Sequence, residues 1–144
     1  MIASPIVTII CITYNQRDSI KSVIEGFLIQ AVNFPIEIII SDDSSDDGTS
    51  ELIREYAGLH KKLITPIIRR QNIGQWQNLR ESLSLAKGKY IAYCEGDDFW
   101  TDKNKLQKQF DFLEKNPSTS LVWTDIDIFH EKSGLYQRGI FENN

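Results

Sequence analysis

Residues 90–100, YIAYCEGDDFW, contain the pattern that decides the fold of this chain. The stretch opens with a short apolar run that ends at Cys94, and it is bounded by Gly88 and Gly96. Apolar runs of this length between glycines are typical of buried strands. Three carboxylates follow within four residues, at Glu95, Asp97 and Asp98. Ligands bind at the carboxyl ends of strands in open α/β sheets, and crowded carboxylates attract a hard divalent cation.

Apolar segments with strand and helix periodicity alternate along the rest of the chain. The pattern predicts strands over residues 6–13, 36–40, 63–68, 90–95, 120–129 and 135–141, with four amphipathic helices between the first five. This alternation indicates a mostly parallel sheet with helices on both faces, a three-layer α/β/α Rossmann-like fold. The last two segments could form a C-terminal hairpin. We expect one domain over residues 1–144.

The composition is that of an ordinary soluble protein. The 144 residues are 41% hydrophobic and carry a formal net charge of −4, so no nucleic-acid partner is expected. Cys11 and Cys94 lie inside apolar runs, which favours buried free thiols in a reducing compartment. The N-terminus lacks the basic region of a signal peptide, and the apolar runs are too short to span a membrane. We therefore expect a cytoplasmic location, or one peripheral to the inner face of the membrane.

Four unusual loops follow the first four strands and should meet at one edge of the sheet. They lie at residues 14–15, 42–47, 72–74 and 95–98. At the tip of its strand, Asp42 is expected to face the ligand and accept hydrogen bonds from a base or a ribose. Asp46 and Asp47 precede a helix, so capping that helix is an equally good interpretation.

Several other ligand-binding motifs are absent or incomplete. Residues 13–17 follow the first strand without the glycines of a dinucleotide fingerprint, and no P-loop occurs. A calcium hand that begins at Asp43 fails because its twelfth position is Arg54 instead of a bidentate glutamate. A receiver domain would carry its acidic groups after other strands.

The remaining chemistry favours a nucleotide diphosphate. Such an anion would be repelled by Asp97 and Asp98 unless Mg²⁺ or Mn²⁺ lay between them. The cation would then stabilise charge on a departing diphosphate, which is the chemistry of group transfer.

The order of the motifs resembles that of the family 2 glycosyltransferases, which have the GT-A fold. The motifs are residues 5–10 (PIVTII), 13–15 (TYN), 40–48 (ISDDSSDDG), Arg70, Asn72 and Gly74, 86–91 (AKGKYI) and 95–100 (EGDDFW). The resemblance covers about residues 4–125. Glu95 departs from the commoner Asp-x-Asp-Asp form of the acidic motif.

The resemblance implies a role for each matching residue. Nucleotide contacts fall on Thr13, Tyr14, Asn15, Asp42, Arg70, Asn72 and Asp97. The metal would be bound by Asp97 and Asp98, and the resemblance leaves open which of them reaches the ribose. Glu95 and Trp100 would lie behind these groups or line the sugar pocket, although core packing is an equal alternative for Trp100.

The family transfers a sugar, with inversion, from a nucleotide-diphosphate sugar, most often a UDP-sugar, to a saccharide or lipid-linked acceptor in cell-wall or polysaccharide biosynthesis. Its carboxylate base lies well downstream of the metal motif, so the resemblance places it beyond residue 144. We therefore expect a donor-binding part with weak or absent transfer activity alone. The alternatives are a non-catalytic nucleotide-sugar-binding module or an inactive fragment, and a nucleotidyltransferase, whose basic glycine-rich loop is missing. A part of a domain that exposes a sheet edge could also form a homodimer.

The remaining aromatic and acidic residues are interpreted structurally. Trp76 and Trp123 are expected in the core, and His60 and His130 at the surface. Asp125 and Asp127 fit placement on a strand better than a catalytic role.

Overall fold

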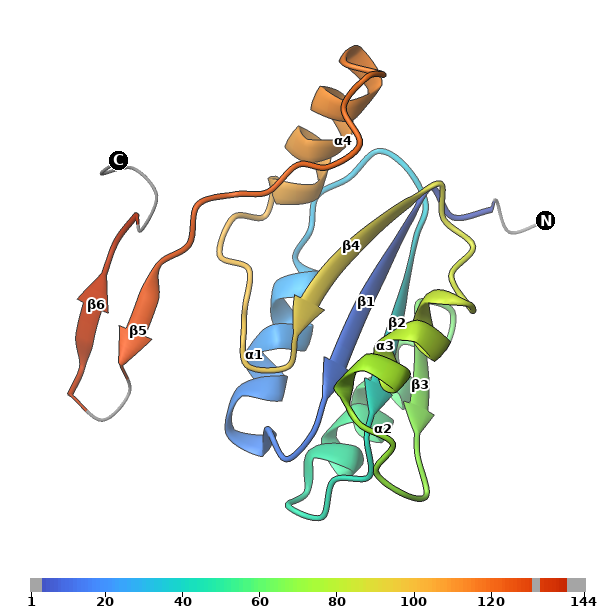
Figure 1. The fold of residues 1–144 in the computed structure, drawn as a ribbon, viewed down its shortest axis with the longest axis vertical. Helices are drawn as coiled ribbons and strands as arrows, with labels where there is room; N and C mark the ends of the chain where they lie inside the picture. Colours follow the sequence, from blue (N-terminus) through green and yellow to red (C-terminus); the bar gives the residue numbers. More distant parts are fainter. Residues whose placement is uncertain (1–3, 131–132, 140–144) are drawn as a thin grey trace. The chain divides into compact units, whose positions relative to one another are not determined.

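A four-stranded parallel sheet in the order β3-β2-β1-β4 organises the first part of the chain (Figure 1). Its strands are β1 (Val7–Thr13), β2 (Ile36–Asp42), β3 (Ile64–Ile68) and β4 (Tyr90–Glu95). The computed structural model describes residues 4–130 and 133–139, and the chain divides into two units, Met1–Gln107 and Lys108–Asn144. In the sheet, Thr13 lies opposite Asp42, and Ile12 lies opposite Glu95. The carboxyl ends of β1, β2 and β4 are therefore level, and the loops that follow them leave from one edge.

Helices cover both faces of this sheet, as the sequence predicts. They are α1 (Arg17–Leu28), α2 (Thr49–Leu59) and α3 (Gln75–Leu83), and α4 (Lys105–Lys115) follows β4. Helices α1 and α2 lie on one face of the sheet, and α3 lies on the other (Figure 1). Right-handed crossovers explain this split, because the strand order runs outward from β1 to β3 and then returns to β4 on the far side of β1.

The main core lies between the sheet and the pair α1 and α2. Alternate side chains of β1 point into it, and all seven residues of that strand are buried. Phe27 of α1 is fully buried and packs edge-on against Trp100, with ring centroids 4.8 Å apart. The close approach needs Gly26, because a Cβ there would lie 2.9 Å from the carbonyl oxygen of Trp100. Cys11 and Cys94 are buried free thiols, which confirms their predicted state.

The C-terminal unit differs from the sequence prediction. The strand expected over residues 120–129 forms only at β5 (Ile128–His130), and residues 121–127 have no regular structure. β5 pairs antiparallel with β6 (Leu135–Gln137), which confirms the hairpin, whereas residues 140–141 of the expected strand lie outside the described residues. A short turn joins antiparallel neighbours at once, whereas a fifth parallel strand would need a long crossover.

Two predicted core residues are exposed. Trp76 is 79% exposed on α3, whose buried positions are Asn78 and Ser82. Trp123 is 73% exposed in the irregular segment before β5. Both predictions are wrong because they rest on residue type, whereas burial depends on which side of an element faces the sheet. Of the predicted surface histidines, His130 is exposed and His60 is half-buried. In the part of the chain that the structure describes, every helix is too short or too polar to cross a membrane.

Candidate nucleotide-binding cleft

A cleft of about 250 Å³ opens at the carboxyl ends of β1 and β4. Its lining comes from all four loops that the sequence places at this edge. The lining residues are Ile12, Thr13, Tyr14, Gln16, Asp43, Asn72, Gly74, Gln75 and Glu95. The four loops meet because the ends of the strands before them are level. Residues up to 83 positions apart in the chain thereby line the same cleft.

The loop after β1 supplies one wall of the cleft. Thr13 is buried at the end of the strand, and Tyr14 is 49% exposed beside the opening. Asn15 adopts a positive φ of 51° and lies outside the lining. It connects two loops instead, because its backbone N–H donates to Ser45 Oγ (2.8 Å) and its Oδ1 accepts from the Asp46 N–H (3.0 Å).

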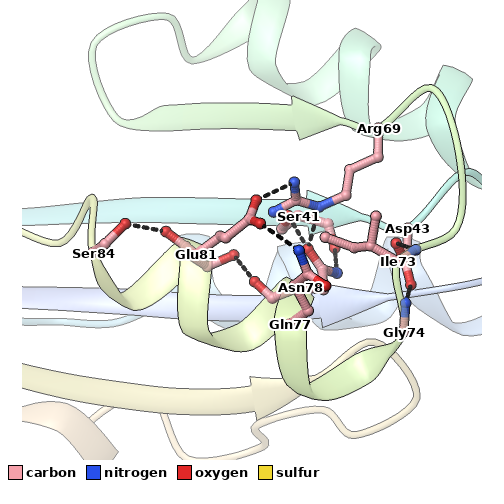
Figure 2. A network of polar contacts seen from close by, with 10 residues as sticks. Ser41, Asp43, Arg69, Ile73, Gly74, Gln77, Asn78, Glu81 and Ser84 are labelled. Carbon is pink, nitrogen blue, oxygen red and sulfur yellow. Dashed lines mark hydrogen bonds and ion pairs between the residues drawn. The ribbon is translucent and has the colours of Figure 1, made fainter.

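The two aspartates at the end of β2, Asp42 within the strand and Asp43 directly after it, have different surroundings. Asp42 is fully buried, and its carboxylate accepts hydrogen bonds from the hydroxyls of Ser45 and Ser50. It does not line the cleft, so the expectation that Asp42 faces a ligand is corrected. Asp43 lines the cleft instead, and its two oxygens accept the backbone N–H groups of Ile73 and Gly74, each at 2.9 Å (Figure 2). Successive residues alternate sides at a strand end, which explains why the neighbour reaches the edge.

Asp47 has the capping role that the sequence left open. Its carboxylate accepts hydrogen bonds from the Thr49 backbone and hydroxyl and from the Arg17 N–H. Partial burial opposes ionisation of this group, but these bonds outweigh it and hold the pKa of Asp47 below its ordinary value. The acidic loop is thereby tied to the beginnings of both α1 and α2.

A polar network fixes α3 against the sheet beside the cleft (Figure 2). The amide of Asn78, which is 1% exposed, donates to the Ser41 carbonyl (3.1 Å) and accepts from the Ser41 hydroxyl (2.5 Å). Arg69 donates to Asn78 Oδ1 (2.8 Å) and forms an ion pair with Glu81 (2.6 Å). Hydrogen bonds from Gln77 and Arg69 lower the pKa of Glu81. The neighbouring Arg70 is exposed and does not line the cleft.

Glu95 lies at the boundary between the cleft and the acidic motif. Its Oε1 accepts hydrogen bonds from the Tyr93 hydroxyl (3.0 Å) and from Gln75 Nε2 (3.2 Å). Burial, followed by the hydrogen bond and the charge of Glu95, raises the pKa of Tyr93, so the phenol stays protonated as a donor. The glutamate is therefore held between β4 and the first residue of α3.

Asp97 and Asp98, the residues predicted to hold a metal, are adjacent in the sequence, and both are exposed. Burial raises the pKa of Asp98, and the charges of Asp97 and Glu95 raise it further. Within residues 4–130 and 133–139, no group of three His, Cys, Asp or Glu side chains is arranged to hold a metal ion. Two carboxylates nevertheless fit Mg²⁺ or Mn²⁺, because these ions commonly take one or two protein oxygens and complete their shell with phosphate oxygens.

Trp100 packs in the core and does not line the cleft. It is 9% exposed, contacts Phe27 and has Lys105 Nζ 4.8 Å from the centre of its ring. The surroundings of Trp100 therefore do not support its alternative assignment to a sugar pocket.

Five cleft residues have no role assigned from the sequence. They are Ile12, Gln16, Asp43, Gly74 and Gln75. Each lies next to a residue with an assigned role or at the start of a helix. The spacing of motifs in the sequence therefore predicts which loops form the cleft, but not which of their side chains face it. Thr13, Tyr14, Asn72 and Glu95 were assigned and do line the cleft, and Asp97 and Asp98 follow directly after it.

Comparison with known proteins identifies the family. The family Glycosyl transferase family 2 matches residues 8–143, and the chain belongs to it. The protein Rv1520 of Mycobacterium tuberculosis is 43% identical over 86% of this chain and 36% of its own length. The Escherichia coli enzyme WfaP, named UDP-Glc:alpha-D-GlcNAc-diphosphoundecaprenol beta-1,3-glucosyltransferase, is 36% identical over 96% of this chain and 51% of its own.

A solved structure agrees with the GT-A assignment. The mannosyltransferase PcManGT from Pyrobaculum calidifontis, in complex with GDP-Man and Mn²⁺, superposes with a TM-score of 0.68 at 25% identity. The match covers 78% of this chain and 33% of PcManGT. The chain thus spans a third to a half of the length of these relatives.

Proposed function

We propose that this chain binds the donor of a metal-dependent, inverting glycosyltransferase. The donor would be a nucleotide-diphosphate sugar, with UDP as the nucleotide, and the acceptor a saccharide or a lipid-linked saccharide. One observation carries the proposal: the cleft formed by the four loops ends at Glu95, directly before the paired carboxylates Asp97 and Asp98. WfaP, whose name specifies UDP-glucose and a lipid-linked acceptor, supports both choices.

The nucleoside would occupy the cleft itself. Tyr14 offers an exposed ring at its opening, and Asp43 offers an acceptor for the N–H groups of a base. Asn72 and Gly74 stand on the side of α3, next to the Asp43 carboxylate. Thr13 and Asn15 would act by fixing the wall, and Asp42, which is fully buried, by holding the acidic loop.

The diphosphate would lie toward Asp97 and Asp98. These two carboxylates would hold Mg²⁺ or Mn²⁺, and Asp97 or Asp98 would also reach the ribose. When bound, the cation supplies charge stabilisation for the departing nucleotide diphosphate. PcManGT, which was solved with Mn²⁺, supports this assignment. The exposed Arg70 is close in sequence to Asn72 and could approach the phosphates from outside the cleft lining.

Transfer activity requires more than the donor site. The relatives are two to three times longer than the part that this chain matches, and the general base would come from such further sequence. We therefore propose that residues 1–144 bind donor with little or no transfer. A non-catalytic nucleotide-sugar-binding module remains the alternative function, since it needs the same cleft and no base.

Calorimetric titration tests the proposal. UDP should bind in the presence of Mn²⁺ and bind at least tenfold more weakly without it, because the cation offsets repulsion between the diphosphate and the carboxylates. The double variant Asp97→Ala, Asp98→Ala should lose the dependence on Mn²⁺. Asp46→Ala is the matched control, since Asp46 is an exposed carboxylate outside the cleft lining. UDP binding that ignores both the metal and the double substitution would refute the metal-dependent mechanism.

A parallel titration with GDP tests the base. UDP is expected to bind more tightly than GDP, and the reverse order would refute the choice of uridine. Hydrolysis or transfer of a UDP-sugar by a longer form of the chain would decide between the enzyme and the module.

A further inference from the structure

The side chain of Gln16 has a free donor at the cleft. Gln16 is the N-cap residue of α1, yet its side chain forms no capping hydrogen bond. The backbone provides the cap contacts instead, with the Gln16 carbonyl accepting from the N–H groups of Ser19 and Ile20. Helix stability therefore does not account for a glutamine at this position.

The Gln16 amide is fixed at one end. Its Oε1 accepts a hydrogen bond from Thr13 Oγ1 at 2.7 Å. Among the described residues, no acceptor is bonded to Nε2, and no unpaired side-chain nitrogen or oxygen is buried. Because Gln16 lines the cleft and is half-buried, Nε2 is a solvent-reachable donor on a held side chain.

The amide lies against the acidic motif. A Cβ on Gly96 would collide with Gln16 Oε1 and would lie 2.5 Å from Thr13 Oγ1. Gly96 is itself held, since its N–H donates to the Ile12 carbonyl (3.0 Å) and its carbonyl accepts from Ser19 Oγ (2.7 Å). Gln16 is thus placed between the end of β1 and the residue that separates Glu95 from Asp97.

Few other side chains at this end of the cleft could bind an anion. Its lining contains the carboxylates Asp43 and Glu95 and neither lysine nor arginine. Gln75 Nε2 already donates to Glu95, and Asn72 Oδ1 accepts from the Gly74 N–H. A diphosphate that approaches Asp97 would therefore meet the Gln16 amide, which lies beside Gly96 and carries an uncommitted neutral donor.

We propose that Gln16 Nε2 donates a hydrogen bond to a diphosphate oxygen of the bound nucleotide. This assignment rests on the proposed function and adds to it a donor that carries no charge. A neutral amide suits the position, because it contributes a hydrogen bond to the phosphate without competing with a cation for the carboxylates.

Gln16→Met tests the assignment, because methionine keeps the length of the side chain and lacks the amide. In the presence of Mn²⁺ it should weaken UDP binding about ten- to hundredfold, the factor for one hydrogen bond to a charged group, and leave uridine binding unchanged. Gln16→Lys, which restores a donor and adds a charge, should recover UDP binding. Gln77→Ala is the control, since Gln77 is an exposed glutamine outside the lining whose side chain contacts Glu81.

The outcomes separate the two proposals. UDP binding that Gln16→Met leaves within twofold, or an equal loss of UDP and uridine binding, would overturn the Gln16 assignment alone. Failure of the unaltered chain to bind UDP would overturn the proposed function and this assignment with it. Both Gln16 variants should lower the midpoint of urea unfolding slightly, because the buried Thr13 hydroxyl loses its acceptor, and uridine binding to the same variants controls for that loss.

Discussion

The geometry of the cleft depends on residues that do not touch it. Asn78 is buried on α3, and its side chain forms three hydrogen bonds, two with Ser41 on β2 and one with Arg69. Two residues after Ser41, Asp43 accepts the N–H groups of Ile73 and Gly74, which lead into the same helix. Sheet and helix are therefore joined at two points, one buried under α3 and the other in the wall of the cleft.

Asn78→Ala should lower the free energy of unfolding by about 2 kcal/mol, because it leaves the buried Ser41 hydroxyl without its partner and opens a small cavity. The same substitution should weaken UDP binding, since the wall at residues 72–75 loses its support. Urea unfolding measures the first effect and calorimetry the second. Gln77→Ala, one residue away on the exposed side, should change stability by less than about 0.5 kcal/mol. A loss at Asn78 no larger than the loss at Gln77 would contradict the structural role of this network.

At the level of elements, two glycines differ in how much space surrounds them for an added side chain. Gly96 follows β4 and packs on Thr13, where an added Cβ would lie 2.6 Å from the Thr13 Cβ. Thr13 belongs to β1 and cannot move aside cheaply. Gly58 lies inside α2, and an added Cβ there would meet nothing within 4 Å.

Gly96→Ala should therefore destabilise the chain by about 1–3 kcal/mol, as expected for overpacking beside a strand. Gly58→Ala should stabilise it by up to about 1 kcal/mol, because alanine favours a helix interior. Thermal unfolding of the two variants provides the measurement. Equal shifts in the same direction would show that the contact between β4 and β1 does not set the position of the acidic motif.

Elements were easier to predict from the sequence than the direction of side chains. Apolar periodicity identified the four strands of the sheet and the helices between them, since each buries a continuous apolar surface. It failed for residues 121–127, where apolar residues occur without a partner strand. It also could not distinguish Asp42 from Asp43, because a one-residue shift at a strand end reverses which carboxylate faces the cleft.

At the level of the whole molecule, the sheet of the N-terminal unit has an open side. β4 is an edge strand in the described part of the chain, and its Ile91 and Tyr93 are 43% and 42% exposed. On α3, Trp76 and Leu83 are seven residues apart, so they share one side of the helix, away from Glu81 and its ion pair with Arg69. They are 79% and 43% exposed, so the unit carries exposed apolar side chains on α3 as well as on β4.

Unpaired strand edges with exposed apolar side chains favour association, so we expect the chain to form a homodimer through β4 at high concentration. Ile91→Lys should weaken the dimer at least about tenfold, because it places a charge on the outer face of the edge strand. Leu59→Lys is the matched control, since Leu59 is 72% exposed at the end of α2, outside the β4 edge. Sedimentation velocity over a range of concentrations separates the two variants. A chain that stays monomeric throughout, or one that Leu59→Lys disrupts as strongly as Ile91→Lys, would show that the β4 edge does not mediate self-association.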